Sequence, residues 1–138
     1  MKKTGSLIVI SGPSGVGKST LIGRVRANMP ELEFSISCTT RSPRTGEVHG
    51  REYYFLSPEE FEEKVKNDGF LEYAGIFARR YGTLKSETLS RLEKGEQVLL
   101  DIDVQGAKQI RQAAENDETI RNAAVFILIA PPSLKALE

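Results

Sequence analysis

Short apolar runs alternate with amphipathic segments along most of this chain. The runs at 98–103 and 124–129 lack polar alternation, which predicts strands buried on both faces of a sheet. A shorter run at 6–10, rich in β-branched residues, predicts one more strand. Segments with helical spacing of apolar residues lie at 18–28, 85–94 and 106–115. Strands that alternate with helices in this way predict an α/β fold with a parallel sheet covered on both faces.

Two of the expected helices carry further signals. The buried stripe of the helix at 18–28 is expected to be Leu21, Ile22 and Val25. A second helix is predicted to begin after Ser57, which forms a capping box with Glu60, with Pro58 at the first helical position. Gly69 is expected to end that helix in a left-handed conformation.

The middle of the chain has a different character. Residues 34–37 alternate and predict a strand, whereas 39–50 are polar, without apolar period, and predict a loop. Aromatic and apolar residues at 52–56 and 70–77 predict further strands. We therefore expect an inserted lobe at 37–88 and a core formed by 1–36 with 89–138.

The composition is that of an ordinary globular protein. Of the 138 residues, 39% are hydrophobic and 28% are charged, which suffices for one domain with a core. Nineteen basic residues balance nineteen acidic ones, so the charge predicts no binding to nucleic acid or to a membrane surface. Cys38 is the single cysteine, which favours a reducing, cytoplasmic location. The sequence predicts no particular oligomeric state.

A glycine-rich segment follows the first predicted strand. The residues GPSGVGKS fit G-x-x-x-x-G-K-[ST], a phosphate-binding loop, and lie between a predicted strand and a predicted helix as the motif requires. Its glycines let successive backbone N–H groups point into one anion-binding concavity, and the helix adds the positive end of its dipole. The expected nucleotide-binding residues are Gly12, Pro13, Ser14, Gly15, Val16, Gly17, Lys18, Ser19 and Thr20.

The charged and hydroxyl groups near this loop suggest a phosphate and metal site. Lys18 is expected to reach the β- and γ-phosphates, and Ser19 to hold Mg²⁺. Asp101 ends an apolar strand and could orient the hydrated Mg²⁺, although an ordinary strand end is the plain alternative. Asp103 is expected to point to the same face as Asp101.

Polar residues in the middle of the chain offer further candidates. Arg41 and Arg44 lie on a loop stiffened by a proline, and arginine binds phosphate bidentately. A solvated loop is the alternative. Tyr53 and Tyr81 could donate to the same phosphate or belong to the core. Glu72 lies in an apolar stretch, where a carboxylate is unusual unless it faces a cleft.

Taken together, these segments resemble the guanylate kinases. The resemblance rests on SGPSGVGKST, SCTTRSPRTGEVHG, RYGT, LDIDVQGAKQI and FILIAPPS, which extend over nearly the whole chain. It implies a three-layer P-loop NTPase fold with a central parallel sheet and an inserted GMP-binding lobe. It also implies transfer of a phosphoryl group from ATP to GMP, giving ADP and GDP, with Mg²⁺ as cofactor.

The resemblance further implies roles for single residues. Those expected to hold the GMP phosphate are Arg41, Arg44, Tyr53 and Tyr81. Those expected near the guanine are Ser37, Glu72, Thr83 and Asp103. The chemistry agrees, because carboxylates suit the guanine donors at N1 and N2 and hydroxyls suit the acceptor at O6. The expected catalytic residues are Lys18, Arg41 and Arg44, which would neutralise charge between two anions without a general base.

Two features depart from the family pattern. Arg79 and Arg80 precede Tyr81 where the family usually has an aromatic or small polar residue. The sequence ends at Glu138, whereas the family continues into an arginine-bearing lid, a last core strand and a helix. A fragment that binds GMP without efficient turnover is therefore one alternative to an active kinase.

Two other hypotheses remain open. Guanylate-kinase-like domains of scaffold proteins bind peptides and do not catalyse, but they typically lose parts of the phosphate loop. Here Lys18, Ser19 and Asp101 are all present, which favours the enzyme. Another small-molecule kinase of the same fold is the third hypothesis, and the guanine-matching residues argue against it.

Overall fold

The computed structural model describes residues 4–12, 17–76 and 79–129 and divides the chain into two compact units. One unit consists of Met1–Phe34 with Arg91–Glu138, and the other of Ser35–Ser90. The expected nucleotide-binding residues Pro13, Ser14, Gly15 and Val16 lie outside the described residues.

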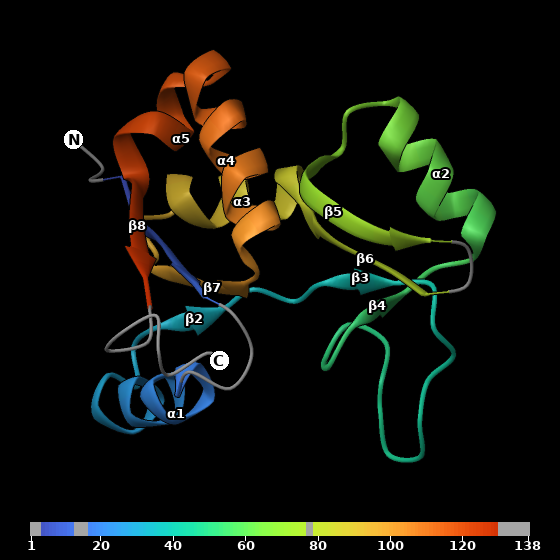
Figure 1. Cartoon of the computed structure of the whole chain (residues 1–138), viewed down its shortest axis with the longest axis horizontal. Coiled ribbons are helices and arrows are strands. Elements are labelled where there is room, and N and C mark those ends of the chain that lie inside the picture. Colours follow the sequence, from blue (N-terminus) through green and yellow to red (C-terminus); the bar gives the residue numbers. More distant parts are fainter. Residues whose placement is uncertain (1–3, 13–16, 77–78, 130–138) are drawn as a thin grey trace, which may run out of the picture. The chain divides into compact units, whose positions relative to one another are not determined.

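The first unit is built on a four-stranded parallel sheet (Figure 1). Its strands, in spatial order, are β2 (Glu33–Phe34), β7 (Val98–Ile102), β1 (Leu7–Ser11) and β8 (Ala124–Leu128). The two inner strands pair from Leu7 opposite Val98 to Ser11 opposite Ile102. This pairing confirms the predicted parallel sheet. Most apolar side chains of the two inner strands are almost fully buried, whereas Ile8 and Ile102 are half-buried.

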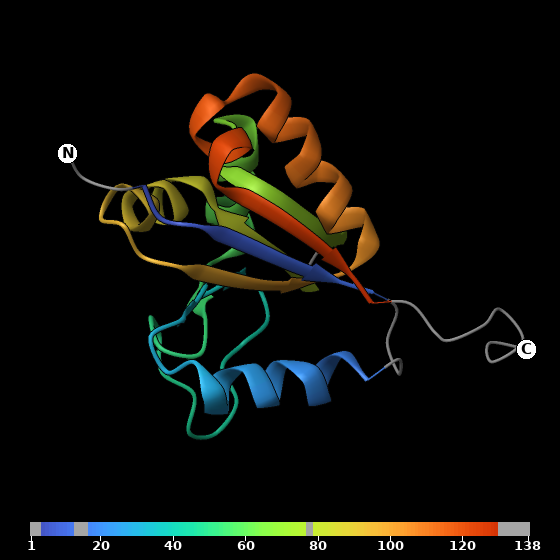
Figure 2. The ribbon, with the colours of Figure 1, turned by 90° about the vertical axis from the view of Figure 1, so that its left-hand side faces the viewer.

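Helices cover both faces of this sheet (Figure 2). They are α1 (Lys18–Asn28) on one face and α4 (Val104–Asn116) with α5 (Glu118–Ala123) on the other. From α1, Ile22 packs against Ile10 and Leu99. The predicted stripe was wrong for Leu21, which is 38% exposed because it lies about 100° round the helix from Ile22.

The strand β8 corrects another prediction. Its apolar run predicted burial on both faces, yet Val125, Ile127 and Leu128 are exposed, Leu128 by 64%. Among the described strands β8 pairs with β1 alone, so it lies at an edge of the sheet where fewer neighbours cover its side chains.

The second unit contains its own four-stranded sheet. In spatial order its strands are β4 (Tyr54–Phe55), β3 (Cys38–Thr39), β6 (Arg79–Leu84) and β5 (Phe70–Ile76). The predicted strand at 34–37 was wrong, because the chain leaves the first sheet at Phe34 and enters the second at Cys38. From here α3 (Lys85–Glu93) leads back to the first unit.

The helix α2 (Pro58–Lys66) covers one face of the second sheet (Figure 1). Phe61 is fully buried there with Cys38 and Phe70, and the rings of Phe61 and Phe70 lie 4.5 Å apart between centroids. Burial raises the pKa of the Cys38 thiol to about 12, so this side chain behaves as a small apolar group. These residues form the core of the second unit.

Both ends of α2 are capped by hydrogen bonds. The predicted capping box is confirmed, since Ser57 Oγ accepts from the Glu60 amide at 3.1 Å and Glu60 Oε1 from the Ser57 amide at 2.9 Å. At the other end the left-handed residue is Asp68, with φ of 55°, and not Gly69. The amides of Asp68 and Gly69 donate to the carbonyls of Val65 and Lys64, which completes a Schellman motif one residue earlier than predicted.

Loss of the Ser57 cap of α2 should destabilise the second unit. Ser57→Ala removes one half of the capping box, and we expect a loss of about 1 kcal/mol in the free energy of unfolding. Equilibrium unfolding in urea measures this loss. The matched control is Ser90→Ala on the exposed surface of α3, which should change stability by less than about 0.5 kcal/mol. Equal effects of the two substitutions would contradict the role of the cap.

Candidate functional site

The ends of the phosphate-loop motif have the backbone geometry that requires glycine. Gly17 immediately precedes α1 with φ of 88°, a left-handed conformation that other residues rarely adopt. At Gly12 a Cβ would lie 2.5 Å from the carbonyl oxygen of Ile129, so no larger residue fits beside β8. The first turn of α1 carries no acidic side chain and receives no side-chain cap at Gly17, which leaves its amides suited to an anion.

Lys18 is held at the ends of the central strands. Its Nζ donates to the carbonyls of Gly12 at 3.3 Å and Ile102 at 3.2 Å, and lies 3.0 Å from Asp101 Oδ1. Three oxygen atoms thus fix the ammonium group next to the start of α1. A phosphate that binds there would replace the Asp101 carboxylate as the partner of Lys18.

The predicted metal ligands offer oxygen atoms only. Ser19 is exposed in the first turn of α1, and Asp101 is the last residue but one of β7, with its side chain 45% exposed. Within the described residues, no group of three or more His, Cys, Asp or Glu could hold a metal ion. Mg²⁺ does not need such a group, because it keeps several waters and takes one or two protein oxygens with substrate phosphates.

Asp103 has a structural partner of its own. It is the N-cap of α4, and its Oδ1 accepts from the Gly106 amide at 2.7 Å. One carboxylate oxygen is therefore committed to the helix. Asp103 belongs to the first unit, whereas the other predicted guanine contacts belong to the second.

The remaining acceptor candidates share one side of the second sheet. In the sheet register Thr83 lies opposite Glu72, and extension of the register by one residue places Ser37 beside Thr83 and Tyr53 beside Ser37. Tyr81 lies two residues before Thr83 and so on the same side of β6. We call the five candidates on this side the polar face; they are Ser37, Tyr53, Glu72, Tyr81 and Thr83. The opposite side carries the core under α2.

A β-bulge in β5 directs Glu72 to the polar face. Phe70 pairs with Leu84 and Glu72 with Thr83, so Leu71 is an extra residue on β5. Without the bulge, the carboxylate would share the side of Phe70. With it, Thr83 Oγ1 donates to Glu72 Oε1 at 2.7 Å, and the two residues are only 1% and 8% exposed.

Arg41 joins the polar face through the two tyrosines. Its guanidinium lies 5.1 Å from the centroid of the Tyr53 ring, and the rings of Tyr53 and Tyr81 are 6.1 Å apart. The Glu47 carboxylate, followed by the hydroxyls of Tyr81 and Tyr53, raises the pKa of Arg41. Three of the four predicted phosphate contacts are therefore brought together. The fourth, Arg44, is exposed on the same loop.

Sequence reasoning missed Glu47. It lies inside the R-x-P-R-x-G-E segment, but no role was predicted for it. Its carboxylate accepts two hydrogen bonds from Arg41, at 2.9 and 3.1 Å, and one from the Arg44 amide at 2.7 Å. These bonds lower the pKa of Glu47 to about 2. A carboxylate a few residues from two arginines in a glycine-containing loop was the signal available.

Arg80 is explained by packing. Its guanidinium lies 4.6 Å from the Phe61 ring centroid and 5.6 Å from that of Tyr73, and Nη1 contacts Glu62 Oε2 at 2.6 Å. Its amide also donates to Thr40 Oγ1 at 2.9 Å. The side chain therefore covers the core under α2 and lies away from the polar face.

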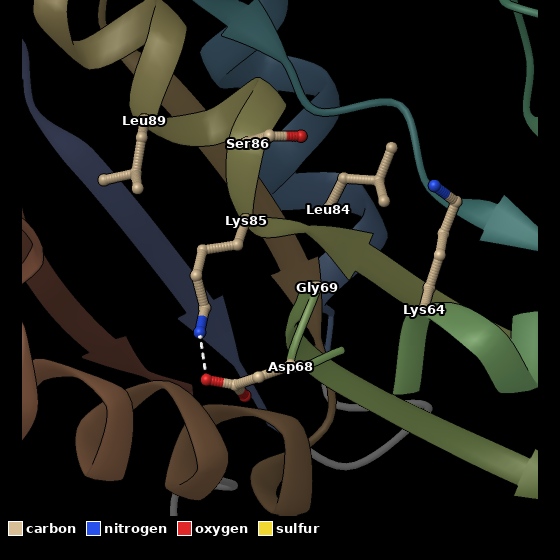
Figure 3. Close-up of a pocket in the computed structure, with 7 residues that line it drawn as sticks. All are labelled: Lys64, Asp68, Gly69, Leu84, Lys85, Ser86 and Leu89. Carbon is tan, nitrogen blue, oxygen red and sulfur yellow. Dashed lines mark hydrogen bonds and ion pairs between the residues drawn. The ribbon is translucent and has the colours of Figure 1, made fainter. Parts of the chain in front are cut away.

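A surface hollow of about 300 Å³ lies elsewhere in the second unit (Figure 3). An ion pair of 2.8 Å between Lys85 Nζ and Asp68 Oδ2 borders it. Its lining residues are Lys64, Asp68, Gly69, Leu84, Lys85, Ser86 and Leu89. None of them is a predicted site residue, and we assign the hollow no role.

The fold and the glycine loop define a class of protein. A parallel sheet between helices, with Gly17 and Lys18 leading from a strand into a helix, is the P-loop NTPase arrangement. A family model for guanylate kinase matches residues 4–138, so this chain belongs to the guanylate kinase family.

Individual relatives agree with this family. A curated guanylate kinase from Clostridium tetani is 47% identical over 134 residues, which are 97% of this chain and 61% of that protein. One from Fusobacterium nucleatum is 55% identical over 107 residues, covering 78% of this chain and 57% of the relative. The crystal structure of guanylate kinase from Anaplasma phagocytophilum matches 99% of this chain and 65% of its own, with a TM-score of 0.65 and 34% identity. The chain thus spans about three fifths of the length of its curated relatives.

In the part of the chain that the structure describes, no helix has the length and apolar character needed to cross a bilayer.

Because of the Arg41–Glu47 pair, the stability of the folded state should depend on pH in the acidic range. Glu47 has its pKa lowered from 4.5 to about 2, so it stabilises the folded state above pH 4.5 and loses this effect as the pH falls towards 2. Thermal unfolding of the wild type and Glu47→Gln should therefore differ by a constant amount near neutral pH. We expect the difference to shrink steadily below about pH 4.5. A difference that persists undiminished at about pH 3 would contradict the assignment.

Proposed function

We propose that this chain binds GMP and ATP and transfers the γ-phosphoryl group of ATP to GMP. The observation that carries the proposal is the buried Glu72–Thr83 pair, which shares the polar face with the Arg41–Tyr53–Tyr81 cluster. A nucleotide needs two such subsites, one with hydrogen-bonding groups for the base and one with positive charge for the phosphate. Membership of the guanylate kinase family supports the same substrate.

The base subsite favours guanine on chemical grounds. The carboxylate of Glu72 accepts hydrogen bonds and so suits the N1 and N2 donors, while the hydroxyls of Ser37 and Thr83 suit O6. Adenine carries an acceptor at N1 and would oppose it to the buried carboxylate. A site built on such matching can discriminate by roughly 10⁴-fold. Asp103 is a further proposed guanine contact, through the carboxylate oxygen that does not cap α4.

The proposed donor site is the phosphate loop of the first unit. The proposed ATP contacts are those of the motif, with Lys18 on the β- and γ-phosphates. Ser19 and Asp101 would hold Mg²⁺, which supplies charge neutralisation when bound. Because the acceptor oxygen is already anionic, Lys18, Arg41 and Arg44 act by positioning and neutralising charge, and no residue acts as general base. The single thiol suits a cytoplasmic setting.

The proposal is tested by titration and by a coupled assay on the same sample. GMP should bind with a clear preference over AMP and guanosine, and ADP should be released only when GMP accompanies ATP. Release of ADP with AMP would indicate another small-molecule kinase. Binding of GMP without ADP release would restrict the proposal to a binding fragment, and absence of GMP binding would overturn it.

Replacement of Lys18 should affect ATP binding without affecting GMP binding. We expect Lys18→Ala to weaken ATP binding at least about tenfold, since a charge-assisted contact is lost, and to abolish transfer. GMP affinity should stay unchanged, because Lys18 belongs to the other unit. Calorimetry with each nucleotide measures both. Lys108→Ala, on the exposed side of α4, is the matched control and should alter neither affinity. A large loss of GMP affinity in Lys18→Ala would argue against the assignment.

Glu72 should control the choice of base. In Glu72→Gln an amide N–H₂ replaces one carboxylate oxygen and opposes the guanine donors, so GMP should lose affinity relative to IMP, which lacks the N2 amino group. We expect the GMP:IMP ratio to fall about tenfold. Competition binding gives this ratio directly, and Glu62→Gln, on the helix above the core, is the control. If the ratio stays fixed, Glu72 does not contact that edge of the base.

A further inference from the structure

Among the described residues, Glu47 is the one carboxylate that contacts both Arg41 and Arg44. Its two oxygens accept from Nη1 and Nη2 of Arg41, and Oε1 also accepts from the backbone amide of Arg44. The pair is sheltered, with the side chains of Arg41 and Glu47 only 11% and 18% exposed. One side chain therefore sets both the orientation of the first guanidinium and the backbone from which the second extends.

The bonds to Glu47 determine which donors of Arg41 stay available. Nη1 donates to Glu47 Oε1 and to the Ser42 carbonyl, at 2.9 Å each, so both of its hydrogens are used. Nη2 uses one hydrogen on Glu47 Oε2. The remaining N–H groups form the Nε–Nη2 edge of the guanidinium. Among the described residues no carboxylate is bonded to that edge.

The tyrosines of the polar face adjoin the same guanidinium. The ring of Tyr53 lies under the guanidinium of Arg41, and the ring of Tyr81 lies beside that of Tyr53. The hydroxyls of both tyrosines interact with Arg41. A phosphate held by the Nε–Nη2 edge could also accept from these phenols, and planar, bidentate recognition of phosphate is the usual geometry for arginine.

We propose that Glu47 is a positioning residue for the acceptor phosphate: it occupies the Nη1–Nη2 edge of Arg41, presents the Nε–Nη2 edge to the ligand and holds Arg44 in place. The proposal rests on the proposed function, since it assumes that the ligand phosphate binds at Arg41. It assigns Glu47 no contact with the substrate.

If Glu47 had a different role, its replacement would change GMP affinity in the opposite direction. If Glu47 were only a counter-ion that the phosphate must displace, loss of its charge would strengthen GMP binding, because a nearby negative charge repels the phosphate. If Glu47 positions Arg41, loss of the carboxylate weakens GMP binding in spite of that relief. The sign of the change in affinity therefore separates the two roles.

Two variants test the proposal. Glu47→Asp keeps the charge but is one methylene too short to hold the Arg41 fork and the Arg44 amide together, and Glu47→Gln keeps the length but cannot accept the fork. GMP affinity should fall about tenfold in each. Guanosine affinity should remain within about twofold, because the base subsite is untouched; a fault in folding would lower both. Calorimetry with GMP and guanosine gives the four comparisons.

Glu52 supplies the matched control. It lies in the same loop. Its carboxylate accepts from the side chain of the neighbouring Arg51 and from the Val48 amide at 3.3 Å, which is a similar arrangement to that of Glu47 but involves neither Arg41 nor Arg44. Glu52→Asp and Glu52→Gln should leave both affinities unchanged.

The possible failures can be told apart. If the wild type does not prefer GMP to guanosine, there is no phosphate site at Arg41, and the proposed function falls together with the role of Glu47. If the wild type prefers GMP and both Glu47 variants keep that preference, only the role of Glu47 is overturned. Tighter GMP binding in Glu47→Gln would identify a displaceable counter-ion and overturn positioning.

Discussion

The alternation of side chains along β6 organises the second unit. Arg80, Gly82 and Leu84 belong to the side that packs under α2, where a Cβ on Gly82 would lie 2.8 Å from the Phe70 ring. Tyr81 and Thr83 fall between them and belong to the polar face. Because the period of a strand is two, the packing of the core fixes the side to which the candidate ligand groups point. A tightly packed core on one side is thus the condition for a polar site on the other.

Both candidate phosphate sites hold a cation against a carboxylate. Lys18 contacts Asp101 in the first unit, and Arg41 contacts Glu47 in the second. The two pairs differ in what an arriving phosphate would change. Among the described residues, Asp101 is the only charged partner of Lys18 and contacts its ammonium group directly. Glu47, in contrast, binds only the Nη1–Nη2 edge of the Arg41 guanidinium and leaves the Nε–Nη2 edge to a second anion. A lysine presents a point charge, but an arginine can bind two anions at once, which allows one pair to be exchanged and the other to be kept.

The sequence predicted the features that depend on local physics. The capping box at Ser57 and the extent of α1 agree with the structure, because they depend on residues within one or two turns. The errors concern tertiary context. An apolar run could not show that β8 lies at an edge, and the alternation at 34–37 could not show that the chain changes sheets there. Likewise Glu47 could be placed only once the fold of the loop was known, since its partners lie three and six residues away in a segment without secondary structure.

The bulge at Leu71 decides the side of the sheet to which each later residue of β5 points. Phe70 and Tyr73 both pack on the α2 side although they are three residues apart, which a regular strand does not allow. Straightening the strand with Leu71 kept in register would turn Glu72 towards the aromatic core and bring Tyr73 to the polar face. Deleting Leu71 would instead make Phe70 and Glu72 neighbours in a regular strand, so that Glu72 would stay on the polar face. The site and the core therefore depend together on this one residue remaining outside the regular pairing.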